Sequence, residues 1–371
     1  MSSKVFIYNL RERKRSESVS EKVRKLFDAA GFRNAFSEKD LVAIKIHFGE
    51  KGNDAYINPI YVRQVVDKVK ERGGKPFLVD SNTLYKGRRS NSVDHIITAI
   101  ENGFAYAVVN APIIIADGLL SKDSVEVEVN KKHFAQVKIS SNIYYSDSMI
   151  VLSHFKGHGL TGFGGAIKNL AMGCAPAAGK QLQHSTIKPE VGEGCRGCES
   201  CVRNCPEDAI SIVDGIAFID KDKCIGCGEC ISMCYFRVIK PQWKTDLKAF
   251  TERLTEYAYG AYITKRHKTV FMNFVMNVTP LCDCVSWSDT AIVPDIGILA
   301  SYDPVAIDQA SCDLVNKQHG LLNTALSEKE TGLLPNEDKF KAVHPKTRGD
   351  IQLEYGETIG LGTRDYELVE L

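Results

Sequence analysis

The chain has 371 residues, 44% of them hydrophobic and 25% charged, which is enough for roughly two or three globular domains with sizeable cores. Its formal net charge of +1 gives no reason to expect nucleic acid or an anionic membrane surface as a partner. No stretch approaches the roughly 20 consecutive apolar residues of a membrane span, and the apolar run Val5–Leu10 is too short for the core of a signal peptide. We therefore expect a cytoplasmic protein whose twelve cysteines bind metal or react rather than form disulfides.

Short apolar runs alternate with amphipathic segments in the first half of the chain. The pattern predicts strands at Val5–Leu10, Leu41–Phe48, Phe77–Val79, Ile113–Ala116 and Met149–Leu152. It predicts helices at Ser20–Ala30, Pro59–Arg72 and Val93–Glu101. Alternation of this kind is typical of an α/β fold in which a mostly parallel sheet has helices on both faces.

The alternation stops near Gln183 and resumes near Trp243. Beyond the interruption, the expected elements are a helix at Leu247–Tyr259, strands at Thr269–Val278 and Asp295–Ala300, and a helix at Asp303–Lys317. In the last of these, Asp303 followed by proline predicts an N-cap and a first-turn proline. We predict one α/β domain in two parts, 1–188 and 242–371, interrupted by a small module at 189–241. No element is predicted in the turn-rich end of the chain.

Eight cysteines in the interruption occur as two copies of the spacing C-x2-C-x2-C-x3-C. The first copy is Cys195, Cys198, Cys201 and Cys205, and the second is Cys224, Cys227, Cys230 and Cys234. Bacterial ferredoxins with two 4Fe-4S clusters use this spacing, and the fourth cysteine of each run binds the other cluster. The spacing therefore assigns one cluster to Cys195, Cys198, Cys201 and Cys234, and the other to Cys224, Cys227, Cys230 and Cys205. Zinc usually takes four ligands and would leave four of these cysteines unused.

Between the two runs, Ala209–Ile212 and Ile216–Ile219 flank an Asp-Gly pair, which predicts a β-hairpin. We therefore expect the inserted module to be a small α+β, ferredoxin-like unit that carries electrons.

Polar side chains gather where the predicted strands end. They are Lys45, His47, Asp80, Ser81, Asn82, His154, Ser301 and Asp303. Ligands of open α/β sheets bind at the carboxyl ends of the strands, so these residues suggest a site, although each could instead cap a turn or a helix. We predict a catalytic cleft, in which a histidine relays protons, lined by Lys45, His47, His154 and His158.

The segment His154–Gly173 is rich in glycine and leads into a predicted helix at Ala166–Met172. Free N–H groups at a helix start attract anions, so we predict that a small anionic ligand or cofactor group is held by Gly162, Gly164, Gly165 and Lys168. The segment matches G-x-G-x-x-G, but no second strand ending in an acidic residue follows, so a nicotinamide site is not expected. The alternative is a tightly packed loop.

Cys282 and Cys284 flank an aspartate. If the chain is extended there, both thiols point the same way and, with nearby imidazoles, would suit a third metal site. Two small buried cysteines are the alternative. Cys174 and Cys312 are expected in the core.

The whole chain resembles a domain-of-unknown-function family of cytoplasmic iron–sulfur proteins that is common in anaerobic bacteria and archaea. The resemblance rests on Lys45–Glu50, Ser153–Gly173, Pro294–Asp308 and the eight cysteines. It implies an α/β domain that contains a bacterial-type ferredoxin module. We expect an oxidoreductase of anaerobic metabolism whose partner is ferredoxin or a larger oxidoreductase. A non-catalytic electron carrier or docking protein, and a scaffold for a metal centre, remain alternatives.

Overall fold

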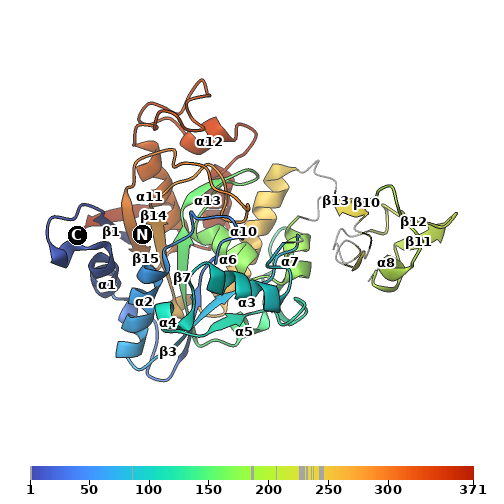
Figure 1. Ribbon diagram of the computed structural model, residues 1–371, viewed down its shortest axis with the longest axis horizontal. Coiled ribbons are helices and arrows are strands. Elements are labelled where there is room, and N and C mark those ends of the chain that lie inside the picture. Colours follow the sequence, from blue (N-terminus) through green and yellow to red (C-terminus); the bar gives the residue numbers. More distant parts are fainter. Residues whose placement is uncertain are drawn as a thin grey trace.

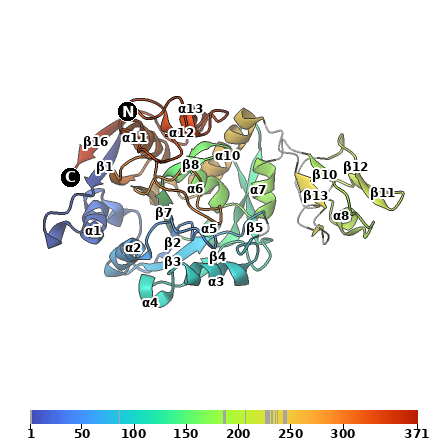
Figure 2. The ribbon, with the colours of Figure 1, turned by 45° about the horizontal axis from the view of Figure 1, so that its top comes forward.

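The computed structural model describes residues 2–85, 87–184, 188–205, 207–224, 230, 233–234, 236, 238–241 and 246–371. Most of them form a body built on one large sheet, and a smaller group of elements lies beside it, next to α7 and α10 (Figures 1 and 2). The predicted cluster ligand Cys227 lies outside the described residues. None of the helices in the described ranges combines the length and the apolar character needed to cross a bilayer.

Eight strands form the large sheet. In spatial order they are β16 (Tyr366–Glu370), β1 (Ser3–Asn9), β15 (Gly297–Ser301), β14 (Thr269–Val275), β7 (Ser148–His154), β2 (Leu41–Lys45), β3 (Lys75–Asp80) and β4 (Ile113–Ile115). Neighbours are parallel except at β15, which is antiparallel to both β1 and β14. The predicted α/β fold with a mostly parallel sheet is confirmed.

Helices cover both faces of this sheet, as predicted. One face carries α1 (Val19–Ala29), α2 (Pro59–Glu71), α3 (Ser92–Glu101) and α4 (Tyr106–Val109). The other carries α6 (Ala166–Gly173), α10 (Leu247–Ile263), α11 (Pro304–Asn316) and α13 (Asp350–Thr358). Strand residues alternate between the two cores: Val42 and Ile44 pack against the first set, and Ala43 packs against the second.

Several short elements were not predicted. They are β5 (Ser124–Glu128), β6 (Gln136–Ser140), α5 (Ser141–Tyr144), β8 (Lys156–His158), β9 (Gly162–Gly164), α7 (Ala177–Gln183), α12 (Lys339–Val343) and the 3-10 turns Arg15–Glu17, Phe32–Asn34 and Arg266–Lys268. At the end of the chain, β16 and α13 were missed as well. β16 is an edge strand that, within the described ranges, pairs with β1 alone, so its sequence needs only a few apolar residues.

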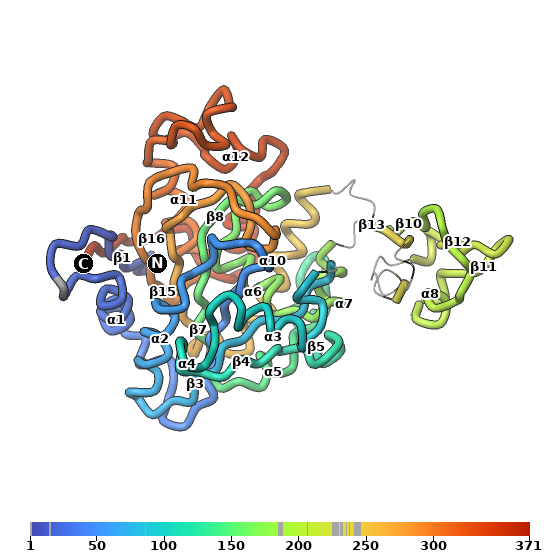
Figure 3. Tube along the Cα trace, in the orientation of Figure 1, coloured from blue at the N-terminus to red at the C-terminus, as the bar shows by residue number. Residues whose placement is uncertain are grey.

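The smaller group of elements lies beside the body in the Cα trace (Figure 3), and it has an apolar core of its own. It contains β10 (Pro189–Val191) paired with β13 (Ile239–Pro241), β11 (Ile210–Val213) paired with β12 (Ile216–Ile219), and α8 (Ser200–Arg203). The predicted hairpin is present, and both turn residues, Asp214 and Gly215, have positive φ as a type I′ turn requires. Pairing of β10 with β13 brings the two ends of this segment together. The exact boundaries 1–188, 189–241 and 242–371 stay a prediction.

Candidate functional site

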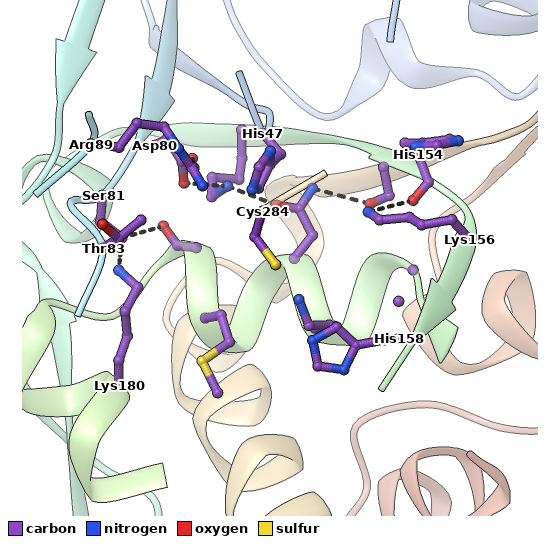
Figure 4. Close-up of a pocket in the computed structure, with 18 of the residues that line it drawn as sticks. His47, Asp80, Ser81, Thr83, Arg89, His154, Lys156, His158, Lys180 and Cys284 are labelled. Atoms are coloured by element: carbon purple, nitrogen blue, oxygen red, sulfur yellow. Dashed lines mark hydrogen bonds and ion pairs between the residues drawn. The ribbon is translucent and has the colours of Figure 1, made fainter. Parts of the chain in front are cut away.

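A cavity of about 300 Å³ opens at the carboxyl ends of β2, β3 and β7 (Figure 4). Lys45, Asp80 and His154 are the last residues of these three strands, and all three line the cavity. Because the three strands are parallel, their ends lie at one edge of the sheet. The structure therefore brings together Lys45, His47, His154, His158 and Lys168, with Cys284 in the same wall.

Ser301 and Asp303 do not reach this edge, and the expectation that they would is wrong. Ser301 ends β15 and Asp303 follows it, and because β15 is antiparallel to its neighbours it ends at the opposite edge of the sheet. There Asp303 caps α11 by accepting from the N–H groups of Val305 and Ala306, each at 2.9 Å. Its predicted capping role is confirmed.

A buried ion-pair network forms one wall of the cavity. The Nζ of Lys45 lies 2.9 Å from the Asp80 carboxylate and donates to the side-chain oxygen of Asn169 on α6 at 2.7 Å. Arg89 joins Asp80 at 3.7 Å and Glu50 at 3.2 Å. Burial alone would raise the pKa of Asp80, but the surrounding cations, led by Lys45, hold it below its usual range. Lys45 thus ties α6 to the sheet, and its predicted catalytic role stays a prediction.

His47 presents one ring nitrogen to the cavity. Its Nδ1 accepts from the backbone N–H of Gly49 at 3.0 Å, while Nε2 has no hydrogen-bond partner among the residues that the structure describes. Burial, reinforced by the charge of Arg89, places the pKa of His47 well below its ordinary value. The ring is therefore neutral at neutral pH, and Nε2 can donate a hydrogen bond to a ligand.

His154 is held on both sides. Its Nδ1 lies 2.8 Å from the Asp283 carboxylate, and its Nε2 lies 2.9 Å from the backbone oxygen of Asn277. Both nitrogens therefore face acceptors, and neither is free to take a proton from a ligand. This geometry does not favour His154 as the histidine that relays protons, and its predicted catalytic role stays a prediction. The residue instead positions Asp283: burial would raise the pKa of that carboxyl, but His154 and Lys156 lower it below its usual range.

The segment that carries Cys282 and Cys284 is a turn, not the extended chain considered from the sequence. The N–H of Val285 donates to the backbone oxygen of Cys282 at 3.0 Å. Asp283 is fixed by His154 and Lys156. The two sulfurs and a ring nitrogen of His158 all lie within 4.8 Å of one another.

The electrostatics of the cysteine turn favour one thiolate. The Sγ of Cys282 lies 3.5 Å from the Nζ of Lys168 and 3.4 Å from the backbone N–H of Cys284. The hydrogen bond from the Cys284 thiol, with help from Lys168, places the pKa of Cys282 well below its ordinary value. The same bond raises the pKa of Cys284. These surroundings favour the thiolate form at Cys282 and the thiol form at Cys284.

Removing the charge of Lys168 should make this pair less reactive near neutral pH. In Lys168→Met, we expect the pH midpoint for alkylation of the 282–284 peptide by iodoacetamide to rise by roughly 1 to 3 units, because a nearby opposite charge shifts a pKa by that amount. Lys168→Arg keeps the charge and serves as the control. Equal midpoints in Lys168→Met and the unaltered protein, measured by mass spectrometry, would rule out the thiolate–ammonium pair.

His158 lies beside the same turn. Its Nδ1 is 2.9 Å from the hydroxyl of Thr161, and burial, reinforced by the charges of Lys168 and Lys156, places its pKa well below its ordinary value. In Figure 4 the Cys284 sulfur lies between the rings of His47 and His158. A ring nitrogen of His158 thus lies within 4.8 Å of both sulfurs, and His47 lines the same cavity.

Two N–H groups at the start of α6 bind an internal carboxylate, so they are not available to the predicted anionic ligand. Of the residues named in that prediction, Gly164, Gly165 and Lys168 line the cavity, and Gly162 lies in the wall of a different hollow. The Asp308 carboxylate, from α11, accepts from the N–H groups of Ala166 at 2.7 Å and Ile167 at 2.9 Å. A Cβ at Gly165 would stand 2.2 Å from that carboxylate, so the glycine makes room for an internal anion. Burial raises the pKa of Asp308 to about 6, although these N–H groups oppose the shift.

Gly157 allows β8 to approach the loop that leads to Cys282. A Cβ there would lie 2.2 Å from the backbone oxygen of Pro280, whereas a Cβ at Gly159 would meet nothing within 4 Å. We expect Gly157→Ala to lower the free energy of unfolding by about 1–3 kcal/mol through overpacking, and Gly159→Ala to change it by less than about 0.5 kcal/mol. Urea unfolding of both variants measures the difference. Equal effects would contradict the close approach.

Sequence patterns did not point to the roles of five further polar residues, which are Arg89, Glu50, Asn169, Asp308 and Lys180. Lys180 donates to the Ser81 hydroxyl and to the Asn82 backbone oxygen, both at 2.6 Å. Burial lowers its pKa to about 8, against the opposing charge of Asp117.

Cys174 and Cys312 pack in or against the core, as predicted, and burial raises the pKa of both thiols.

The smaller group of elements contains a second hollow, separate from the cavity in the body. Its wall includes the four cysteines Cys195, Cys198, Cys201 and Cys234. Three of these belong to the first run and one to the second, which is the set that the spacing assigns to one cluster. Cys205, Cys224 and Cys230 belong to or pack against the same small core.

The donor set in this part fits an iron–sulfur cluster. Every cysteine that the structure describes is free of a disulfide. The N–H of Ala217 donates to the Cys195 sulfur at 3.3 Å, and that of Ala209 donates to the Cys205 sulfur at 3.2 Å. Such N–H···S bonds stabilise negative charge on sulfur, and thiolates are the ligands that iron–sulfur clusters require.

Comparison with known proteins gives a family match and short relatives. A family model described as Domain of unknown function (DUF362) matches residues 42–313. A component of the ion-translocating oxidoreductase complex of Methanosarcina acetivorans is 40% identical over 54 residues, which are 15% of this chain and 20% of that protein. An uncharacterized ferredoxin of Methanocaldococcus jannaschii is 48% identical over 42 residues, 11% of this chain and 28% of that protein. The matches thus span less than a third of each relative.

Two solved structures are weakly similar in shape. The lactate racemase apoprotein of Thermoanaerobacterium thermosaccharolyticum aligns with a TM-score of 0.37 and 11% identity, over 68% of this chain and 49% of that one. A Thermotoga maritima protein aligns with a TM-score of 0.41 and 10% identity, over 82% of this chain and 59% of that one. Likeness at this level supports no inference about function.

Proposed function

This chain belongs to the family described as Domain of unknown function (DUF362), and we propose that it is an iron–sulfur electron-transfer protein. In this proposal, the eight cysteines of the two runs hold two 4Fe-4S clusters. Electrons pass one at a time between a redox partner, such as ferredoxin or a larger oxidoreductase, and the cavity at the carboxyl edge of the sheet.

One observation carries the proposal: the hollow walled by Cys195, Cys198, Cys201 and Cys234. A cubane needs four thiolates, and the crossed ligand set of two-cluster ferredoxins predicts this combination. The short relatives, one a component of an oxidoreductase complex and the other a ferredoxin, support the same assignment.

The residues around the hollow would hold and shield a cluster. Ala217 donates its N–H to the Cys195 sulfur in this wall, which Ile239 also lines. Ala209 donates to the Cys205 sulfur of the other ligand set, and Ile210 and Ile219 belong to the same small apolar core. When bound, each cluster supplies one-electron transfer, with a potential that depends on these hydrogen bonds and on access of water.

In this proposal, the cavity binds the ligand with which the clusters exchange electrons. A neutral His47 directs Nε2 into it, and Cys284 provides a thiol in the same wall. These groups can donate hydrogen bonds and protons to a ligand that is being reduced. The smaller group of elements packs on a core of its own, which also suits a non-catalytic carrier that docks to a larger enzyme. A stable complex between this protein and such an enzyme would favour that alternative.

The proposal is tested by purifying the protein without exposure to air and measuring its iron, acid-labile sulfide and zinc. We expect about eight irons and about eight sulfides per chain, as two cubanes require. Stoichiometric zinc in place of iron would contradict the proposal.

A further inference from the structure

We propose that Cys282 and Cys284 form a redox-active dithiol that closes to an intrachain disulfide in the wall of the cavity, by exchange with a small disulfide. This pair belongs to the α/β body, and its chemistry does not depend on the clusters proposed for the other part of the chain.

The geometry places the two sulfurs close together, with Cys284 in the cavity wall and Cys282 buried behind it. They lie within 4.8 Å of each other, in a turn closed by the hydrogen bond from Val285 to Cys282. A disulfide requires a sulfur–sulfur distance of about 2.05 Å, so closing the bond calls for side-chain rotation and a small adjustment of the turn. Asp283, anchored between them by His154 and Lys156, fixes the turn from the other side.

The surroundings activate this pair, in contrast to the other thiols that the structure describes in the body. The Lys168 ammonium lies 3.5 Å from the Cys282 sulfur, and Lys156 and Arg89 add positive charge nearby. Reactive cysteines occur in electropositive, partly accessible sites of this kind. Cys174 is fully buried in the apolar core, where a thiol stays protonated and inert.

Access to the pair is through Cys284. Cys282 is only 3% exposed, whereas Cys284 is partly exposed and lines the cavity. A small disulfide in the cavity therefore meets Cys284 first. The two sulfurs lie within 4.8 Å of each other, so the proton of the Cys284 thiol can pass to Cys282 as the Cys284 sulfur attacks.

The exchange balances in atoms and electrons. The Cys284 sulfur attacks the disulfide R–S–S–R, forms a mixed disulfide and releases one R–S⁻. The Cys282 sulfur then attacks Cys284, which forms the Cys282–Cys284 bond and releases a second R–S⁻, while the proton of the Cys284 thiol leaves with one of the two products. Two electrons thus move from the protein dithiol to the small disulfide, which becomes one thiol and one thiolate.

A metal ion bound by His158, Cys282 and Cys284 is the competing interpretation. The contact between Lys168 and Cys282 argues against it, because the thiolate charge is already balanced by an ammonium that would repel a divalent cation. The two chemistries predict different products at the same two sulfurs, so one experiment can decide between them.

The test equilibrates anaerobic protein with defined mixtures of reduced and oxidised glutathione, quenches it in acid, alkylates the free thiols and analyses the 282–284 peptide by mass spectrometry. We expect this peptide to lose both alkylation sites together as the mixture becomes more oxidising. Cys282→Ser should instead accumulate a mixed disulfide at Cys284, and Cys174→Ser should behave as the unaltered protein does.

Two results would overturn the dithiol proposal. One is full alkylation of both cysteines in every mixture. The other is one equivalent of zinc, or of iron beyond the amount that the eight cluster cysteines account for, that is lost in both Cys282→Ser and Cys284→Ser. Either result leaves the electron-transfer proposal untouched, because that proposal is judged by the iron and sulfide of the other part of the chain.

Discussion

Replacing Cys195 and Cys234 together by alanine should remove one cluster and leave about four irons per chain. In the crossed arrangement these two cysteines hold the same cubane, and both lie in the wall of the same hollow. The second substitution should therefore remove no iron beyond the iron that the first substitution removes. Anaerobic iron and sulfide determination on the single and double variants measures the effect.

The matched control pairs Cys195→Ala with Cys205→Ala. Both residues belong to the first run of the sequence, but the crossed arrangement gives them to different clusters, so this double variant should lose both. If each run instead held its own cluster, the variant with Cys195 and Cys205 replaced would keep about four irons. The variant with Cys195 and Cys234 replaced would then lose both clusters. Four irons retained with Cys195 and Cys205 replaced would therefore refute the crossed arrangement.

Asp80→Asn should be among the most destabilising single changes in the α/β body, with an expected loss of about 3–5 kcal/mol in the free energy of unfolding. The carboxylate is buried against Lys45 at 2.9 Å and Arg89 at 3.7 Å. Asparagine would leave the buried Lys45 without its counter-charge, and Arg89 with Glu50 alone at 3.2 Å. Urea unfolding at neutral pH measures the loss. A change below about 1 kcal/mol would show that the network does not hold the cavity wall together.

Asp28→Asn supplies the control, since Asp28 pairs with Lys68 at 2.8 Å but its side chain is 53% exposed. Screening by solvent limits its expected effect on the free energy of unfolding to about 1 kcal/mol or less.

The contribution of the Asp80 carboxylate to the free energy of unfolding should also depend on pH. Its pKa is lowered in the folded protein from an ordinary value of 3.8, so its contribution is complete above that value and is lost as the pH falls below it. The difference between the unaltered protein and Asp80→Asn should therefore narrow in acid.

Local patterns in the sequence predicted the parts of the site that depend on spacing along the chain. The cysteine runs, the Asp-Gly hairpin and the Asp303 cap each involve residues that are near neighbours in sequence. The contact between Lys45 and Asp80 could also be predicted. Each residue lies at the end of an apolar run that predicts a buried, parallel strand.

Features that depend on strand direction or on contacts between distant helices could not be predicted. An apolar run such as Gly297–Ser301 fits a parallel or an antiparallel strand equally well, so the sequence could not place Ser301 and Asp303 at the far edge. In the sequence, nothing distinguishes Asp308 from other polar residues of a helix. Its role depends on the packing of α11 against α6, which brings its carboxylate to the Ala166 N–H. The anion predicted at this helix start is therefore supplied by the chain itself.

Electron paramagnetic resonance of the fully reduced protein, prepared without air, is the decisive measurement for the two-cluster assignment. Two reduced cubanes in one small module should give a spectrum broadened by the interaction of two spins. The Cys195→Ala, Cys234→Ala double variant should give the simple spectrum of one isolated cubane. A single isolated spin in the unaltered protein, or no cubane signal at all, would contradict the assignment of two clusters to the eight cysteines.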